Sequence, residues 1–174
     1  MTRNELIKRV KETAYLEGNF TLRSGKQSKY YLDKYLFETC PDILKALGKE
    51  FAKHVGNDVT LIAGAELGGV ALAAATAMET GKNWVIIRNS KKGYGTGKMV
   101  EGVLKQGDVV LLVEDIATTG GQVLEAAKVI TEAGAKVKKI VAVIDRKQGA
   151  GENITSAGYK FESLLTKDDL GIKD

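Results

Sequence analysis

Hydrophobic residues gather in four short, unbroken runs in the last two-thirds of the chain. The runs are VTLIAGA (59–65), NWVIIR (83–88), VVLLVED (109–115) and KIVAVID (139–145). Continuous apolar runs of this length are typical of strands that are buried on both faces. Helical segments over 68–80 and 121–133 separate two pairs of these runs, and each segment ends at a glycine, Gly81 or Gly134. This alternation predicts an α/β fold with a doubly wound, mostly parallel sheet.

The first third of the chain follows another pattern. Thr2 and Glu5 form a T-x-x-E capping box before apolar positions that repeat every four residues, which predicts a helix ending near Gly18. The stretch 20–37 is rich in β-forming residues around a glycine turn, and it predicts irregular strands. A second helix is expected to begin near Pro41, because proline is favoured in a first helical turn.

Length and composition indicate an ordinary globular protein. The chain has 174 residues, of which 44% are hydrophobic and 28% charged, and no linker rich in proline or serine interrupts it. We therefore expect one domain over 1–174, with residues 1–57 forming N-terminal helices and a small hood and residues 58–174 forming the α/β core.

Charge and cysteine content indicate which classes of binding partner and which cellular compartment to expect. The net charge of +4 comes from lysines spread along the chain, so it favours solubility over nucleic-acid binding. One cysteine, Cys40, excludes an internal disulfide. The charged N-terminus has no apolar core, and no run approaches the roughly 20 apolar residues of a membrane span. We expect a cytoplasmic protein with no membrane or nucleic-acid partner.

Two adjacent carboxylates end the third apolar run. VVLLVEDIATTGGQ (109–122) carries Glu114 and Asp115 directly before a Thr-Thr-Gly-Gly loop that enters a helix. Buried carboxylates are costly unless they have partners. A glycine-rich loop at a helix start can bind a phosphate through backbone N–H groups, and carboxylates can accept hydrogen bonds from sugar hydroxyls or bind Mg²⁺. The stretch therefore suits a ribose 5-phosphate, although it is neither a Walker A loop nor a dinucleotide fingerprint.

Two other segments carry a weaker signal. ELGGVALAAA (66–75) repeats the form of TTGGQVLEAA (118–127), a strand end followed by Gly-Gly and an alanine-rich helix. Two such loops indicate two phosphate sites on one ligand, or two ordinary turns that need glycine. RNSKKGYGTGK (88–98) places four cations among three glycines. It suits a lid over a polyanion, or a solvated basic loop.

These stretches together resemble a known family. VVLLVEDIATTGGQ resembles the phosphoribosyl pyrophosphate signature of the type I phosphoribosyltransferases. Three more stretches resemble the orotate-specific members: FTLRSGKQSKYYLD, IAGAELGGVALA and RNSKKGYGTGKMVEG. The resemblance covers the chain from about residue 18 to 149. It implies transfer of a 5-phosphoribosyl group from phosphoribosyl pyrophosphate to orotate, with Mg²⁺, giving orotidine 5′-monophosphate and pyrophosphate.

The resemblance also implies roles for individual residues. The catalytic residues it implies are Arg88, Lys92, Glu114 and Asp115. Those implied to bind phosphoribosyl pyrophosphate are Leu67, Gly68, Arg88, Lys91, Lys92, Tyr94, Glu114, Asp115, Ile116, Ala117, Thr118, Thr119, Gly120, Gly121 and Gln122. Those implied to bind orotate are Lys26, Tyr31, Leu32, Thr118 and Arg146. No direct metal ligand is certain: Mg²⁺ is expected to bind through the substrate, with Glu114 and Asp115 as candidate ligands.

The resemblance also implies how the chains assemble. It implies a homodimer in which the lid, residues 89–102, reaches the partner's site. The chain departs from many relatives at Asn89, where they have lysine, and at Tyr94, where they have histidine. Two alternative functions remain open. One is a transferase for adenine or xanthine, against which Arg146 and the FTLRSG stretch argue. The other is a non-catalytic regulator that binds nucleic acid, against which the lid cations and the acid pair argue.

Overall fold

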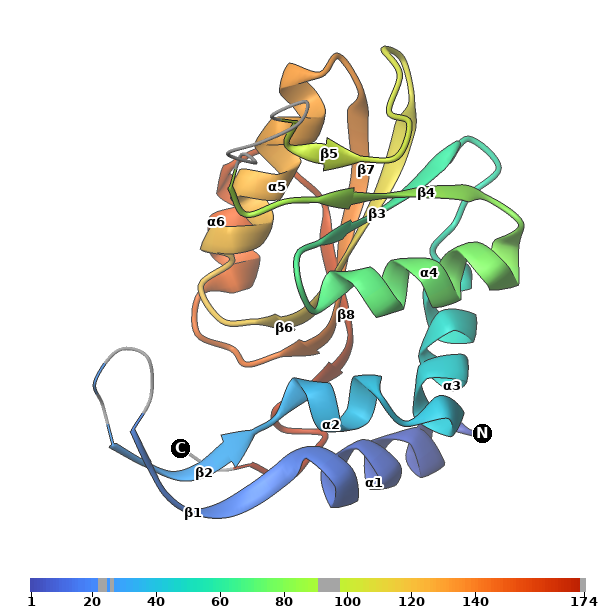
Figure 1. The fold of residues 1–174 in the computed structure, drawn as a ribbon. Helices are drawn as coiled ribbons and strands as arrows, with labels where there is room; N and C mark the ends of the chain where they lie inside the picture. The colour runs from blue at the N-terminus through green and yellow to red at the C-terminus, as the bar shows by residue number, and fades with distance from the viewer. Residues whose placement is uncertain (22–24, 26, 91–97, 173–174) are drawn as a thin grey trace.

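A six-stranded sheet forms the centre of the molecule (Figure 1). The computed structural model describes residues 1–21, 25, 27–90 and 98–172. The strands are β3 (Leu61–Ala65), β4 (Asn83–Ile87), β5 (Val100–Glu101), β6 (Val109–Ala117), β7 (Lys136–Asp145) and β8 (Phe161–Thr166). Their order is β5-β4-β3-β6-β7-β8, and all are parallel to their neighbours except β5. The predicted α/β fold with a mostly parallel sheet is confirmed, and each of the four apolar runs forms a strand.

Helices cover both faces of this sheet. The helices α3 (Pro41–Ala52) and α4 (Gly69–Thr80) lie on one face, and α5 (Gly121–Glu132) and α6 (Ala150–Ser156) lie on the other (Figure 1). Neighbouring residues of a strand point to opposite faces. Thus Leu111 of β6 packs with α3 and α4, whereas Leu112 packs with α5, and both are fully buried. This is why the strand sequences are continuous apolar runs rather than alternating ones.

The N-terminal part forms the hood expected from the sequence, with different boundaries. It consists of α1 (Arg3–Ala14), β1 (Tyr15–Thr21), β2 (Gln27–Leu32) and α2 (Lys34–Glu38). The capping box of α1 is present, but the helix ends at Ala14 and not near Gly18. The expectation was wrong because Tyr15 already pairs with Leu32 in an antiparallel hairpin.

The short helix α2 also differs from the expected strand. The side chain of Asp33 accepts a hydrogen bond from the backbone N–H of Tyr35 at 3.1 Å, and this bond caps the helix start. The side chain of Phe37 is fully buried in the core shared with α1 and α3. A local cap and one buried aromatic residue therefore stabilise a turn of helix inside a β-rich stretch.

The strand order creates a crevice at the carboxyl ends of the central strands. From β3 the chain moves to β4 on one side, and it later returns to place β6 on the other side of β3. The loops that follow β3 and β6 therefore diverge, and ligands of open α/β sheets bind at such a point beside the carboxyl ends of the strands. Among the helices that the structure describes, none combines the length and apolar character needed to cross a membrane.

Candidate active site

A cavity of about 430 Å³ opens at the carboxyl end of β6. One unbroken stretch, residues 114–123, forms most of its wall, and Arg146 after β7 completes it on the core side. The hood contributes Tyr31, Leu32 and Lys34. The cavity therefore joins the predicted phosphate loop, the acid pair and four of the five residues expected to bind the base, Tyr31, Leu32, Thr118 and Arg146.

The acid pair is buried in the floor of this cavity. Glu114 is 6% exposed and Asp115 is 2% exposed. Glu114 Oε1 accepts a hydrogen bond from the backbone N–H of Asp115 at 3.3 Å, whereas its buried Oε2 has no protein partner. Burial, and then the charge of Asp115, raises the pKa of Glu114 well above its usual value. Glu114 thus lines the cavity with a carboxyl group of which one oxygen has no hydrogen-bond partner in the protein.

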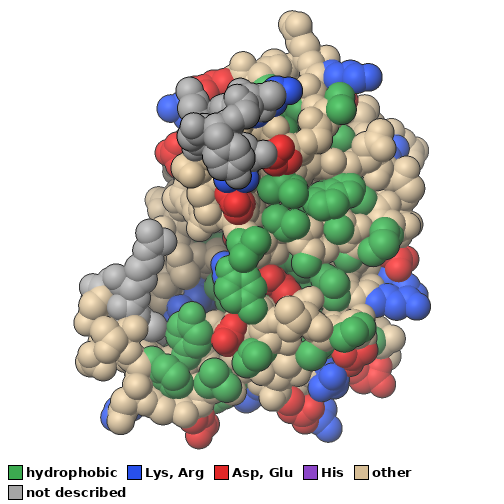
Figure 2. Space-filling view, in the orientation of Figure 1, with side chains coloured by type: hydrophobic (Ala, Val, Ile, Leu, Met, Phe, Trp, Pro, Cys, Tyr) green, Lys and Arg blue, Asp and Glu red, His purple; other side chains and the backbone are tan. Residues whose placement is uncertain are grey.

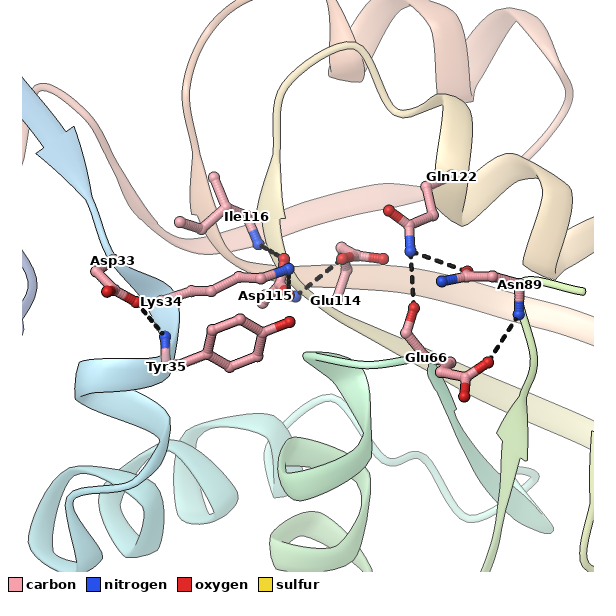
Figure 3. A network of polar contacts seen from close by, with 9 residues as sticks. All are labelled: Asp33, Lys34, Tyr35, Glu66, Asn89, Glu114, Asp115, Ile116 and Gln122. Carbon is pink, nitrogen blue, oxygen red and sulfur yellow. Dashed lines mark hydrogen bonds and ion pairs between the residues drawn. The ribbon is translucent and has the colours of Figure 1, made fainter. Parts of the chain in front are cut away.

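Both oxygens of Asp115 have partners. Oδ1 accepts a hydrogen bond from the backbone N–H of Ile116, and Oδ2 accepts one from Nζ of Lys34 at 2.5 Å (Figure 3). The backbone of Gly68, in the loop after β3, packs directly against the same carboxylate. Because a carboxylate has about four acceptor positions, Asp115 keeps some for a ligand despite these contacts.

The loop between β6 and α5 lines the cavity and leads into the start of that helix. Gly120 occupies the N-cap position of α5 with φ 80°, a left-handed conformation that glycine adopts without strain. No side chain caps this helix start. The amide of Asn153 donates to the backbone oxygen of Thr119 at 2.9 Å, which fixes the loop. Uncapped N–H groups at the positive end of a helix favour a phosphate.

Arg146 lies beside the hood aromatics. Its NH2 group donates a hydrogen bond to the hydroxyl of Tyr30 at 2.8 Å, and its guanidinium lies 5.5 Å from the centre of that ring. Tyr30 in turn stacks on Tyr15 at 5.7 Å. The buried Nε of Arg146 has no protein partner. The contacts with Tyr30 therefore hold the guanidinium in place at the wall of the cavity.

A polar network lies next to the cavity and ties three segments together. Gln122 at the start of α5 donates to the backbone oxygen of Glu66 at 2.7 Å and to the side-chain oxygen of Asn89 at 3.0 Å (Figure 3). The backbone N–H of Asn89 donates to the Glu66 carboxylate at 3.1 Å. The ends of β3 and β4 are thus linked to the phosphate loop. Asn89 thus bonds to both the loop after β3 and the start of α5.

Three predicted residues do not line this cavity: Leu67, Gly68 and Arg88. Gly68 nevertheless packs against Asp115. Arg88 lines a neighbouring cavity with Asn89 and Gln122, and its guanidinium is 3.7 Å from the carboxylate of Glu66. Leu67 is 59% exposed beside the acid pair's loop. Four other predicted residues lie outside the residues that the structure describes: Lys26, Lys91, Lys92 and Tyr94.

Sequence reasoning missed Lys34 and Tyr30. Both are close to predicted residues in the sequence, yet their contacts reach Asp115 and Arg146, which are 81 and 116 residues away. The only local signal was the possibility that Asp33 begins a helix. No periodic pattern encodes such distant pairs.

The described residues do not form a complete metal site of their own. They contain no group of three or more His, Cys, Asp or Glu side chains placed to hold a metal ion. The free oxygen of Glu114 and the carboxylate of Asp115 are hard oxygen donors of the kind that Mg²⁺ prefers. This set fits an ion that brings most of its ligands from a bound phosphate and from water.

Comparisons with known proteins agree with this arrangement. A family described as the phosphoribosyl transferase domain matches residues 37–161. An orotate phosphoribosyltransferase of Natronomonas pharaonis is 43% identical over 171 residues, which cover 98% of each chain.

Solved structures give the same result for the fold. The crystal structure of Mycobacterium tuberculosis orotate phosphoribosyltransferase with Fe(III) dicitrate has a TM-score of 0.88 and 30% identity, and covers 98% of this chain and 99% of its own. The structure of the same M. tuberculosis protein with 5-phospho-alpha-D-ribosyl 1-diphosphate has a TM-score of 0.84 and 28% identity, with 98% and 99% covered.

Proposed function

The chain belongs to the orotate phosphoribosyltransferases, and we propose that its cavity transfers a 5-phosphoribosyl group from phosphoribosyl pyrophosphate to orotate. The products are orotidine 5′-monophosphate and pyrophosphate, in the synthesis of pyrimidine nucleotides. One observation carries the proposal: the acid pair, the uncapped helix start and Arg146 line one cavity.

The loop from Thr118 to Gln122 is assigned to the 5-phosphate. Its support is the start of α5, where no side chain occupies the N-cap position. The backbone N–H groups there, with the threonine hydroxyls, match a monophosphate in size and charge. Ile116 and Ala117 form the strand end that leads into this loop.

The acid pair is assigned to the ribose. Its hydroxyls can donate to the carboxyl oxygens of the acid pair, which lines the cavity. As pyrophosphate leaves, positive charge develops on the sugar ring, and nearby carboxylates stabilise that charge. No side chain has to act as a nucleophile, since N1 of orotate attacks the anomeric carbon itself.

The side of the cavity formed by Arg146 and the hood is assigned to orotate. Orotate is planar and carries a carboxylate and carbonyl oxygens, which suit the fork of a guanidinium. Tyr31, Leu32 and Thr118 line the same cavity. Tyr31 and Leu32 are assigned to the cover over the ring, and Thr118 to contact with both substrates. Lys26 is assigned to orotate on the family resemblance alone.

The pyrophosphate is assigned to the loop after β3 and to the basic segment that follows β4. Backbone N–H groups of Leu67 and Gly68, with Arg88, are its proposed partners, and Lys91, Lys92 and Tyr94 are added on the resemblance. Mg²⁺, when bound, offsets the charge of the leaving pyrophosphate. Glu114 and Asp115, which are assigned to the ribose, are the proposed contacts of that ion.

The assembly proposal is a homodimer in which residues 89–102 reach the partner's site. It is supported by large apolar side chains exposed on one face, which Figure 2 displays over α2, β4 and α4. The exposed residues include Tyr35, Leu36 and Met78, and Met78 is 80% exposed. Exposed apolar surface of this kind marks interaction sites. We further propose that residues 1–174 act as one domain and that the protein works in the cytoplasm.

A substrate panel tests the function. Purified protein is incubated with phosphoribosyl pyrophosphate and Mg²⁺ together with orotate, adenine or xanthine in separate reactions. We expect nucleotide formation with orotate alone. Nucleotide formation from a purine base without any from orotate would replace this function with that of a purine transferase.

A further inference from the structure

The hood places a cation, Lys34, beside the acid pair. Lys34 is not among the residues whose roles the family resemblance implies. Lys34 is the first residue of α2, two positions after Leu32 at the base side of the cavity. Its side chain crosses to β6 and ends 2.5 Å from Oδ2 of Asp115 (Figure 3). Lys34 is 29% exposed and the Asp115 side chain is 3% exposed, so water screens this ion pair little.

Contacts from three segments fix the Asp115 carboxylate. Lys34 holds Oδ2 from the hood, and the backbone N–H of Ile116 holds Oδ1 from within β6. The backbone of Gly68 packs against the carboxylate next to Oδ2. Of these three, only the contact from Lys34 comes from a side chain, and only this contact carries charge.

The charges around this carboxylate make Lys34 difficult to replace. Three carboxyl groups, those of Glu38, Glu114 and Asp115, are buried at this end of the sheet. Oε1 of Glu38 and Oε2 of Glu114 have no hydrogen-bond partner. Within the described part of the chain, Lys34 is the cation that the structure pairs with this group. Its loss would leave the buried carboxylate of Asp115 without a paired cation, which is strongly unfavourable.

The electrostatic environment keeps Lys34 charged. Burial alone would lower the pKa of Lys34, but the charge of Asp115 and its hydrogen bond outweigh burial and raise that pKa. The ammonium group therefore stays protonated at neutral pH, and it can orient Asp115 throughout the reaction.

We propose that Lys34 is a positioning residue for phosphoribosyl transfer, which orients Asp115 toward the ribose and links the hood over the base to the sugar site. The inference rests on the proposed function, because it assigns Lys34 a task in that reaction. Lys34 acts through Asp115. Removing Lys34 should therefore disturb the contacts of the ribose and not those of the base. The short distance along the chain from Leu32 to Lys34 makes the position of the hood and the orientation of Asp115 depend on each other.

A double-mutant cycle tests the inference. We measure kcat/KM for phosphoribosyl pyrophosphate in wild type, Lys34→Met, Asp115→Asn and the double variant, with radiolabelled orotate for the slow variants. Lys34→Met is expected to lower kcat/KM by roughly tenfold or more in the wild-type background. In the Asp115→Asn background the same change should cost less than about twofold, because residues that act as a unit are not additive.

Three further measurements separate positioning from a structural role. Lys34→Arg keeps the charge and should restore most of the activity. Calorimetric titration should still find one phosphoribosyl pyrophosphate bound per Lys34→Met chain, which shows that the chains are folded. Lys138→Met removes another ion pair, 2.6 Å from Asp58 and away from the cavity, and should leave kcat/KM unchanged. If Lys34→Met does not fold, Lys34→Gln takes its place.

The outcomes are distinct. Equal losses from Lys34→Met in both backgrounds would overturn the inference, since Lys34 would then not act through Asp115. Unchanged kcat/KM in Lys34→Met would overturn it as well. Wild-type protein that does not use orotate would instead contradict the proposed function.

Discussion

Gly68 and Asp115 are packed so closely that a Cβ atom on Gly68 would lie 1.6 Å from Oδ2 of Asp115. Gly68 has φ −65° and ψ −32°, an ordinary helical conformation that any residue can adopt. Glycine is therefore required here by space and not by backbone conformation. The contact joins the loop after β3 to the end of β6, the two segments between which the crevice of the sheet opens.

Gly68→Ala is expected to displace the Asp115 carboxylate and to lower turnover by roughly a hundredfold, the cost of about 1 Å of misplacement in an active site. The measurement is kcat with saturating substrates. Gly151→Ala is the matched control, because a Cβ there would meet only a ring carbon of Phe161 at an ordinary 3.7 Å. Normal turnover in Gly68→Ala would show that the contact does not set the position of Asp115.

Arg146→Ala should weaken the use of orotate far more than that of phosphoribosyl pyrophosphate. Losing charge-assisted hydrogen bonds to the base predicts a rise in KM for orotate of about 10- to 100-fold. Tyr30→Phe, which removes the hydroxyl that Arg146 contacts at 2.8 Å, should raise the same KM by a smaller factor. Equal increases in KM for both substrates in Arg146→Ala would indicate a structural role instead.

Combining Glu114→Gln with Asp115→Asn preserves side-chain volume and removes any negative charge that the acid pair carries. Turnover is expected to fall by at least about a hundredfold, since the charge that develops on the ribose loses its stabilisation. Circular dichroism should show an unchanged fold. Turnover near the wild-type value in this double variant would contradict the assignment of the acid pair.

Glu38 should make the protein less stable as the pH rises. Burial, and then the charges of Asp115 and Asp33, raises its pKa from 4.5 to about 8, although Lys34 acts in the opposite direction. Between these two values the folded protein holds a proton that the unfolded chain releases, so the free energy of unfolding falls with increasing pH. Each pKa unit corresponds to about 1.4 kcal/mol, so the whole shift amounts to several kcal/mol.

Glu38→Gln tests this pH dependence. Urea unfolding is measured at pH 5 and pH 8 in wild type and variant. The variant should gain stability relative to wild type at pH 8 and little at pH 5, by on the order of a few kcal/mol between the two. Identical pH dependence in the two proteins would show that Glu38 does not titrate in this window.

Mixed dimers test whether the lid acts on the partner's site. Lys92→Ala and Asp115→Asn homodimers should each be nearly inactive. After unfolding and refolding in equal amounts, about half of the dimers should be mixed, and each should contain one site without a substitution. Activity should then recover to about a quarter of wild type. Absence of recovery, with mixed dimers confirmed by mass spectrometry, would assign Lys92 to its own subunit's site.

The sequence predicted the centre of the fold because burial on both faces leaves a clear signal. β3, β4, β6 and β7 are continuous apolar runs, and their assignment is confirmed. β8 was missed because it lies at the edge of the sheet, where Glu162 and Ser163 interrupt the apolar pattern. The end of α1 was misplaced because pairing of Tyr15 with Leu32 overrides the local helical periodicity.

In the candidate site, too, the sequence predicted what is local in the chain and missed what depends on tertiary packing. Glu114, Asp115 and the loop to Gln122 were recognised because they are contiguous, and the structure brings them together in one cavity. Lys34 was not recognised, because its contact with Asp115 spans 81 residues and depends on where the hood packs. Local patterns therefore identify a strand end with its loop, whereas ion pairs between distant elements require the tertiary structure.

The most direct test of the central claim is the absorbance of orotate after addition of phosphoribosyl pyrophosphate and Mg²⁺ to the wild-type protein. The absorbance should fall only when all three are present, with one pyrophosphate released for each orotate consumed, and a chelator should stop the reaction. An unchanged orotate absorbance with folded protein and both additions present would contradict the assignment of this cavity to orotate phosphoribosyl transfer.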